Sequence, residues 1–123
     1  MRHSNLFASN LVGTLSNAIG AFVDMKSFSV SGLTGTVPAS MSAWKKVTYI
    51  SLRGNKFVGV APALDYGAMM LGQCVLLDAP YFKHPRFPGN TFSCPFPPGV
   101  TKKCQMFKGA MYEPEYEPVT NAD

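Results

Sequence analysis

The chain has 123 residues, which is enough for one domain and too few for two. Hydrophobic residues make up 46% and charged residues 15%, which excludes a wholly disordered chain, and no apolar run approaches the roughly 18 residues of a transmembrane helix. The net charge of +4 combines eleven basic and three acidic residues over 1–108 with four acidic residues over 109–123. No Arg/Lys stripe alternates with aromatic residues, so we expect no nucleic-acid partner, and no membrane contact within this segment.

The chain repeats itself at one fixed shift, which brings Leu11 onto Leu33. When the sequence is slid against itself by this amount, ten positions of the same chemical class coincide. The matched pairs are Leu11–Leu33, Gly13–Gly35, Thr14–Thr36, Leu15–Val37, Ile19–Met41, Phe22–Trp44, Met25–Val47, Phe28–Ile50, Val30–Leu52 and Gly32–Gly54. One such unit is too short to bury an apolar face alone, so we expect neighbouring units to stack.

Within one unit the apolar spacing changes from three residues to two. The steps from Met41 to Trp44 and on to Val47 are three residues long, which predicts a helix-like or 3₁₀-like path. The step from Ile50 to Leu52 is two residues long, which predicts a strand with both side chains on one face. Each unit is therefore expected to contain one short strand and one tight return, with Trp44 in the core.

The segment 47–62, VTYISLRGNKFVGVAP, resembles a leucine-rich repeat of the plant type, whose pattern is LxxLxLxxNxLxGxIP. The pattern positions are filled, in order, by Ile50, Leu52, Asn55, Phe57, Gly59, Ala61 and Pro62. The preceding unit fits over 28–38 but lacks the two residues that would contain the Asn. The first unit enters midway, with Ser9 in the Asn place and Ser16 where Pro is expected.

The resemblance implies an α/β repeat solenoid with short parallel strands on the concave face and 3₁₀ or loop returns. The implied coil is right-handed and incomplete at its N-terminus, similar to the C-terminal end of a longer surface or receptor-like repeat protein. In such a coil Asn55 and Asn90 would hydrogen-bond backbone groups of the turns. The other positions with an expected structural role are Gly35, Gly59, Pro38 and Pro62.

Three regions are expected along the chain. Repeats cover 4–97, as about two complete units with partial ones. The segment 78–88, DAPYFKHPRFP, interrupts the last unit and has three prolines, so it is an exposed insertion, a gene-model artefact or a recognition loop. Residues 98–108 resemble the cysteine-bearing C-terminal cap of extracellular repeat proteins, and the acidic, proline-rich residues 109–123 are expected to be disordered.

Three cysteines allow one disulfide and leave one thiol. Cys94 and Cys104 enclose nine residues at the end of the repeats, and their pairing would stabilise the cap by about 2–3 kcal/mol. Cys74 falls at an inward strand position, so a buried thiol is expected there. A zinc site has poor ligand spacing, and a nucleophilic pair of Cys104 with His84 lacks an orienting Asn or Asp. We therefore expect no metal, no cofactor and no catalytic residue.

Strand positions beside the buried ones are expected to point outward onto the concave face. These positions are Ser27, Ser29 and Ser31 in one unit and Tyr49, Ser51 and Arg53 in the next. Members of the family commonly bind protein or peptide ligands on this face, so the resemblance implies the same here, with Tyr49 and Arg53 as anchors. The alternatives are a truncated structural fragment without a ligand and, third, a Cys/His enzyme.

The expected location is extracellular or at the cell surface. This expectation follows from the resemblance together with the inferred disulfide, which needs an oxidising compartment. The first residues do not fit a secretory signal, because no unbroken apolar core follows Arg2.

Overall fold

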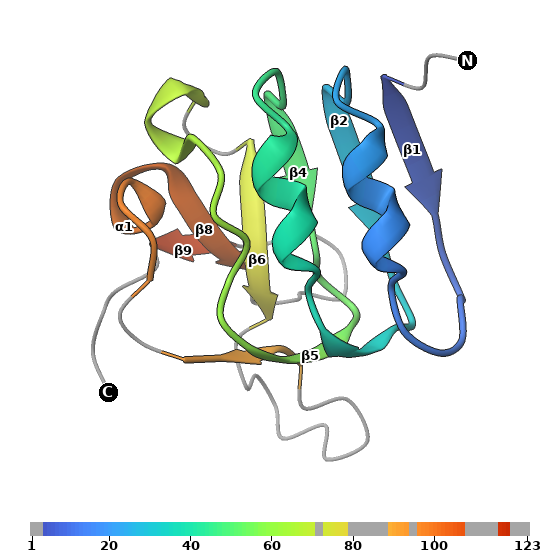
Figure 1. Ribbon diagram of the computed structural model, residues 1–123. Coiled ribbons are helices and arrows are strands. Elements are labelled where there is room, and N and C mark those ends of the chain that lie inside the picture. Colours follow the sequence, from blue (N-terminus) through green and yellow to red (C-terminus); the bar gives the residue numbers. More distant parts are fainter. Residues whose placement is uncertain (1–3, 71–72, 79–88, 94–95, 108–115, 119–123) are drawn as a thin grey trace.

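Parallel strands dominate the computed structural model of the chain, which describes residues 4–70, 73–78, 89–93, 96–107 and 116–118 (Figure 1). Within these ranges the strands form one sheet of six strands and one of three, and short 3₁₀ helices alternate with them. The architecture is of the α/β type, which is the class that the sequence predicts. No helix within the same ranges is long and apolar enough to cross a membrane.

The larger sheet has the strand order β1-β2-β4-β6-β8-β9. Its strands are β1 (Asn5–Ala8), β2 (Ser27–Val30), β4 (Tyr49–Ser51), β6 (Cys74–Asp78), β8 (Cys104–Phe107) and β9 (Tyr116–Pro118). The first five pair in parallel with their neighbours, and β9 pairs antiparallel with β8. The sheet therefore grows by one strand with each successive pass of the chain, until β9 reverses the direction.

The smaller sheet has the strand order β3-β5-β7, and all of its pairs are parallel. Its strands are β3 (Thr34–Thr36), β5 (Lys56–Gly59) and β7 (Thr91–Phe92). In Figure 1 this sheet runs along the bottom of the molecule, below the arrowheads of β1 and β6. Each of its strands follows a strand of the larger sheet along the chain.

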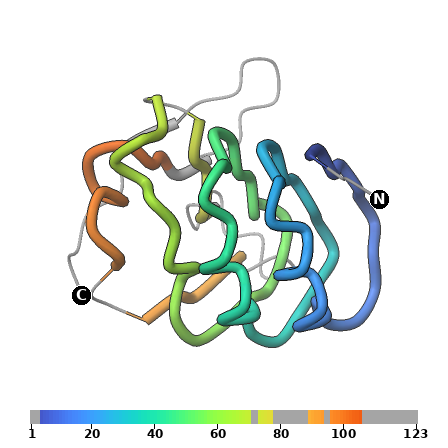
Figure 2. Tube along the Cα trace, turned by 45° about the horizontal axis from the view of Figure 1, so that its top comes forward, coloured from blue at the N-terminus to red at the C-terminus, as the bar shows by residue number. Residues whose placement is uncertain are grey.

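Short helices lie between the passes. They are η1 (Asn17–Ala21), η2 (Ala39–Ala43) and η3 (Tyr66–Ala68), which are 3₁₀ helices, and the α-helical turn α1 (Val100–Lys103). Figures 1 and 2 show η1 and η2 side by side over one face of the larger sheet. The Ser40 hydroxyl donates to the carbonyl of Asn17 at 2.6 Å, and a Cβ at Gly20 would lie only 2.5 Å from Ser40, so this contact requires glycine.

The pairing register of the larger sheet reproduces the shift found in the sequence. Leu6 pairs with Phe28, and Phe28 pairs with Ile50, each one repeat further along the chain. Ile50 in turn pairs with Cys74, after a slightly longer spacing. The side chains of Phe28, Ile50 and Cys74 are fully buried, so equivalent positions of successive passes build the core in layers.

Trp44 is one of the largest buried side chains of this core, as the sequence predicts. It is 1% exposed, and its ring meets the edge of Phe28 at a centroid distance of 4.9 Å. Its indole Nε1 donates to the carbonyl of Ile19 at 3.1 Å, so the polar atom of the ring is satisfied inside the core.

Asn55 is 2% exposed and bonds backbone groups of two successive passes. Its Oδ1 accepts from the N–H of Leu33 at 2.9 Å. Its Nδ2 donates to the carbonyls of Val30 and Leu52, both at 2.8 Å. The amide thus satisfies buried backbone groups that the strands leave unpaired at this turn.

Asn90 repeats this arrangement one pass later. Its Oδ1 accepts from the N–H of Phe57 at 2.8 Å, and its Nδ2 donates to the carbonyls of Leu52 and Leu76, both at 2.7 Å. The carbonyl of Leu52 accepts from both asparagines, which joins them into one continuous series of hydrogen bonds. This is the structural role that the sequence predicts for Asn55 and Asn90.

The other predicted structural positions are two glycines in strands of the smaller sheet and two prolines that follow these strands. Gly35 and Gly59 both have a φ of 85°, in the left-handed region that favours glycine. Pro38 directly precedes η2, and its carbonyl accepts the first hydrogen bond of that helix at 3.2 Å. The carbonyl of Pro62 accepts from the buried hydroxyl of Tyr66 at 2.5 Å.

The repeat pattern resumes at Gly89, as the alignment around the insertion predicts. Gly54 and Gly89 precede the two asparagines and have left-handed φ values of 81° and 76°. The start of the insertion is corrected by one residue, because Asp78 is the last residue of β6 rather than the first of a loop. The remaining residues, 79–88, lie outside the described ranges.

The C-terminal part extends the sheet further than the sequence suggests. The segment 98–108, expected to be a cap, contains α1 and β8, and β8 pairs in parallel with β6. Strand β9 falls in the tail expected to be disordered, so that prediction is wrong for residues 116–118. The other tail residues lie outside the described ranges.

Candidate functional site

The candidate site is the face of the larger sheet that points away from η1 and η2 (Figure 1). One row of residues crosses four strands in register on this face. Phe7 pairs with Ser29, and Ser29 pairs with Ser51. Ser51 then pairs with Val75 on β6. Two serines therefore lie between two apolar side chains on neighbouring strands.

An open depression of about 680 Å³ lies over this row. Five of the six residues predicted for the ligand-binding face line it, namely Ser29, Ser31, Tyr49, Ser51 and Arg53. The other residues that line it are Phe7, Ala8, Ser9, Asn10, Val30, Gly32, Gly54 and Val75. The structure thus gathers residues from four strands around one hollow.

Two of the predicted residues differ from the others in their position. Ser27 is half-buried on β2 and is not part of the lining. Ser51 lines the depression but is only 4% exposed, so it forms the floor and offers little surface to a ligand. Tyr49 is half-buried and Arg53 is exposed, so both present more surface than Ser51.

The depression follows from the sizes of the side chains along the row. Ser29 and Ser51 are small, whereas Phe7 on β1 and Tyr49, which precedes Ser51 by two residues on β4, are large. The Phe7 and Tyr49 rings approach to a centroid distance of 6.5 Å at an angle of 40°, and Phe7 is 64% exposed. Small residues between large ones leave a hollow with an aromatic wall.

The chemistry of the lining is that of a binding surface with mixed character. The aromatic wall offers apolar contact, and the serine hydroxyls can donate and accept hydrogen bonds. Val75 is only 5% exposed, so like Ser51 it belongs to the floor. Arg53 supplies a planar guanidinium, which fits a carboxylate or a peptide carbonyl. The described lining contains no acidic side chain.

Phe7 and Val75 also belong to this surface, although neither was among the residues predicted for it. The repeat shift is the signal that could have found Phe7, because one such shift leads from Phe7 to Ser29. Val75 follows Ser51 at the slightly longer spacing that also separates Cys74 from Ile50. Both residues lie outside the two best-matching units, which alone supplied the predicted face.

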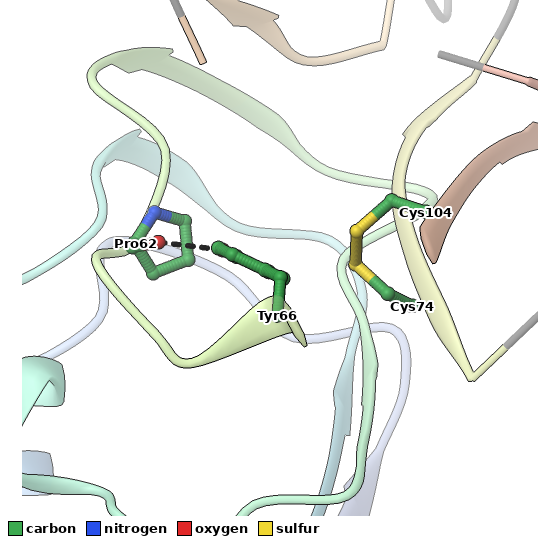
Figure 3. Close-up of a disulfide and its surroundings, with 4 residues drawn as sticks. All are labelled: Pro62, Tyr66, Cys74 and Cys104. Carbon is green, nitrogen blue, oxygen red and sulfur yellow. Dashed lines mark hydrogen bonds between the residues drawn. A yellow bond between two sulfur atoms is a disulfide. The ribbon is translucent and has the colours of Figure 1, made fainter. Parts of the chain in front are cut away.

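The predicted pairing of Cys94 with Cys104 is wrong. Cys104 is bonded to Cys74, and the two Cα atoms are 4.5 Å apart (Figure 3). The physical reason is that β8 continues the sheet beside β6, which makes these two residues direct strand neighbours. Both are buried, so Cys74 is a disulfide partner and not the expected buried thiol. Cys94 lies outside the described ranges.

The disulfide also bears on the alternative catalytic hypothesis. A nucleophilic cysteine must be a thiolate, and Cys104 has no free thiol while it is bonded to Cys74. His84, its suggested partner, lies outside the described ranges. The pairing of Cys104 with His84 is therefore not supported by the oxidised structure.

Tyr66 is a buried titratable group near this end of the core. Its hydroxyl donates to the carbonyl of Pro62 (Figure 3), and burial raises the pKa of Tyr66 well above its ordinary value of 10. The hydroxyl is engaged in this bond, and Tyr66 is not part of the lining of the depression, so its role is structural.

No protein-family model, no curated protein and no solved structure matches the chain in comparisons with known proteins.

Proposed function

We propose that the protein is a binding module of the plant-type leucine-rich repeat class, which holds a protein or peptide ligand on the face of its larger sheet. In this proposal the successive passes are turns of a right-handed repeat solenoid, and the depression lies on its concave side. The proposal assigns binding to the chain and no catalytic step.

The repeat assignment is supported by three independent agreements. Parallel strands pair at the spacings of the sequence repeat, as Phe28 does with Ile50. The two motif asparagines, Asn55 and Asn90, make equivalent backbone contacts. The positive-φ glycines recur at equivalent places, as at Gly35 and Gly59.

The observation that carries the binding proposal is the depression on the sheet. Outward residues of neighbouring strands converge there, and they combine an aromatic pair, an arginine and hydroxyl groups. Tyr and Arg are the residues that most often dominate binding energy at protein interfaces. Tyr49 and Arg53 are therefore the proposed anchors, with Phe7 as an additional apolar contact.

The proposed location is extracellular or at the cell surface. The disulfide between Cys74 and Cys104 is compatible with an oxidising compartment, where such bonds persist. A structural fragment without a ligand is the alternative function, and it predicts that no peptide binds to the depression.

The test is a selection of peptides from a random display library against the oxidised chain. The dissociation constants of enriched peptides would then be measured for the parent and for Tyr49→Ala and Arg53→Ala. If each residue is an anchor, each substitution weakens binding by at least about 1 kcal/mol, or about fivefold. Lys56→Ala is the control, because Lys56 is an exposed residue of β5 in the smaller sheet.

Two results would contradict the proposal. Failure to enrich any peptide that binds the folded chain would favour the structural fragment. Peptides whose affinity ignores Tyr49 and Arg53, but falls when 78–88 is deleted, would make that segment the recognition element.

A further inference from the structure

The N-terminal end of the molecule exposes a layer that is buried in the other passes. We call residues 4–24 the end layer. Its inward residues Leu6, Ala8, Leu15, Ile19 and Phe22 pack against the core but are only partly buried. Their equivalents in the next repeat are at most 7% exposed; these are Phe28, Val30, Val37, Met41 and Trp44. The end layer is therefore a core layer that lacks a cover among the described residues.

The exposed side chains of the end layer are uncharged, and four of them are large and apolar. Phe7 is 64% exposed, Val12 93% and Val23 52%, and Leu11 is 37% exposed. Residues 4–23 contain no Asp, Glu, Lys, Arg or His, although the chain as a whole carries a net charge of +4. Asp24, the last residue of the end layer, forms an ion pair with Lys46 at 2.7 Å. A contact between two copies of this surface would face no like-charge repulsion, whereas the basic remainder of the body would.

The two edge strands of the larger sheet also differ in charge and in proline content. At the far edge, β9 includes Glu117 and Pro118, and charged residues and proline on an edge strand oppose further pairing. At the near edge, β1 has the sequence NLFA, with no charge and no proline. Among the described strands none pairs with the outer side of β1, so that edge is open to another strand.

The backbone of β1 directs hydrogen-bonding groups to the open side at Asn5 and Phe7. The carbonyl of Ser4 accepts from the N–H of Ser27 at 3.0 Å. The carbonyl of Ala8 accepts from the N–H of Ser31 at 3.1 Å. Because alternate residues of a strand point their backbone groups to opposite sides, Asn5 and Phe7 point theirs away from β2.

We propose that the end layer is the interface of a two-fold dimer, in which β1 pairs antiparallel with the β1 of a second copy of this chain and Phe7 lies opposite its own symmetry mate. The larger sheets of the two copies then become one continuous sheet. This inference concerns the edge of the sheet and requires no ligand, although Phe7, Ala8, Ser9 and Asn10 of the end layer also line the depression.

The register centred on Phe7 is consistent with both the backbone and the side chains. Phe7 would exchange two hydrogen bonds with its mate, using the N–H and carbonyl that point outward. Leu6 of one copy would lie opposite Ala8 of the other, so that apolar inward residues meet on the core side. An antiparallel pair also brings the end of β1, with Val12, toward the start of the partner strand, near Val23.

A stable contact requires a definite area from the end layer. A standard protein interface buries roughly 800 Å² on each side, which is about 10% of the surface of a small protein. The total surface of this chain is 7547 Å², so the end layer needs to contribute about that same fraction. An isologous contact also closes after two copies, which prevents the open edge from propagating into larger aggregates.

The first test measures the mass of the oxidised chain by light scattering over a range of protein concentrations. The expected result is a dimer that becomes monomeric when Phe7 is replaced by Arg, because two like charges would then face each other at the two-fold axis. The matched control is Val60→Arg, since Val60 is 70% exposed after β5 and outside the end layer. Tyr49→Ala and Arg53→Ala should also remain dimeric, which separates this inference from the ligand proposal.

A second measurement tests the dimer even if Phe7→Arg fails to fold. In a Cys94→Ser background, Phe7→Cys should form a covalent dimer on mild oxidation, because residues opposite each other in such a pair have Cα atoms about 5.5 Å apart. Val60→Cys should not do so at the same concentration. A parent chain that is monomeric at every concentration, a dimer insensitive to Phe7→Arg, or equal cross-linking of the two cysteine variants would each overturn the proposal.

Discussion

Asn55 and Asn90 offer the sharpest test of the repeat assignment, because both side-chain amides donate to the carbonyl of Leu52. Replacing Asn55 by Ala removes the partner of two buried backbone groups, the N–H of Leu33 and the carbonyl of Val30. Each buried group left without its partner costs about 1–3 kcal/mol, so the free energy of unfolding should fall by roughly 2–6 kcal/mol. The carbonyl of Leu52 keeps one bond in this variant, from Asn90.

The same reasoning predicts a coupling between the two asparagines. Asn90→Ala removes the partner of the N–H of Phe57 and of the carbonyl of Leu76, while Leu52 keeps its bond from Asn55. Only the double variant leaves the carbonyl of Leu52 without either amide. The double variant should therefore lose about 1–3 kcal/mol more than the sum of the two single losses.

The assay is urea unfolding followed by the fluorescence of Trp44, the only tryptophan in the chain. An osmolyte such as trimethylamine N-oxide would keep the double variant folded at zero denaturant. Asn17→Ala is the control, because Asn17 is exposed and contributes a backbone carbonyl and not its amide to the contact with η2. Strictly additive losses, or a loss below about 1 kcal/mol for Asn55→Ala, would refute the series of bonds through Leu52.

The core and its covalent link carry four further predictions. Peptide mapping without reductant should recover Cys74 joined to Cys104, whereas a peptide with a Cys94–Cys104 bond would support the pairing predicted from the sequence. Reduction should lower the free energy of unfolding by roughly 3–4 kcal/mol, because the bond closes a loop of sequence separation 30. Trp44→Ala should cost about 3–5 kcal/mol in thermal or urea unfolding, and a melting temperature indistinguishable from that of the parent would contradict its buried position. Deleting 79–88 should change stability by less than about 1 kcal/mol and keep unfolding cooperative, because β6 stays whole and the bond from Asn90 to the carbonyl of Leu76 spans the junction; a non-cooperative transition would show otherwise. Burial raises the pKa of Tyr66 in the folded state, so the contribution of Tyr66 to stability should be fully present below pH 10 and decline above it, as the unfolded state ionises. Tyr66→Phe should remove that part of the decline when unfolding is measured against pH.

The fold could be predicted where the sequence repeats and could not where it departs from the repeat. Trp44 and Asn55 lie where the pattern places them, because their positions depend on neighbours at a fixed shift. The bond between Cys74 and Cys104 depends on β8 lying next to β6, and no repeat position marks β8 in the sequence. Strand β9 arises in an acidic, proline-rich segment whose composition favours disorder, and only its pairing with β8 orders it.

The candidate surface shows a related limit of sequence reasoning. Tyr49 and Arg53 can be identified by chemical type, whereas Ser29 and Ser51 are uninformative in the sequence because serine has little recognition chemistry of its own. In the structure these serines matter through their size, since the depression lies where two small side chains pair between Phe7 and Val75. A hollow is a property of a row across strands, and it emerges only when the register places small residues next to one another. Substituting Ser29 by a larger residue should therefore fill the depression and abolish peptide binding, while the inward core of β2 stays intact.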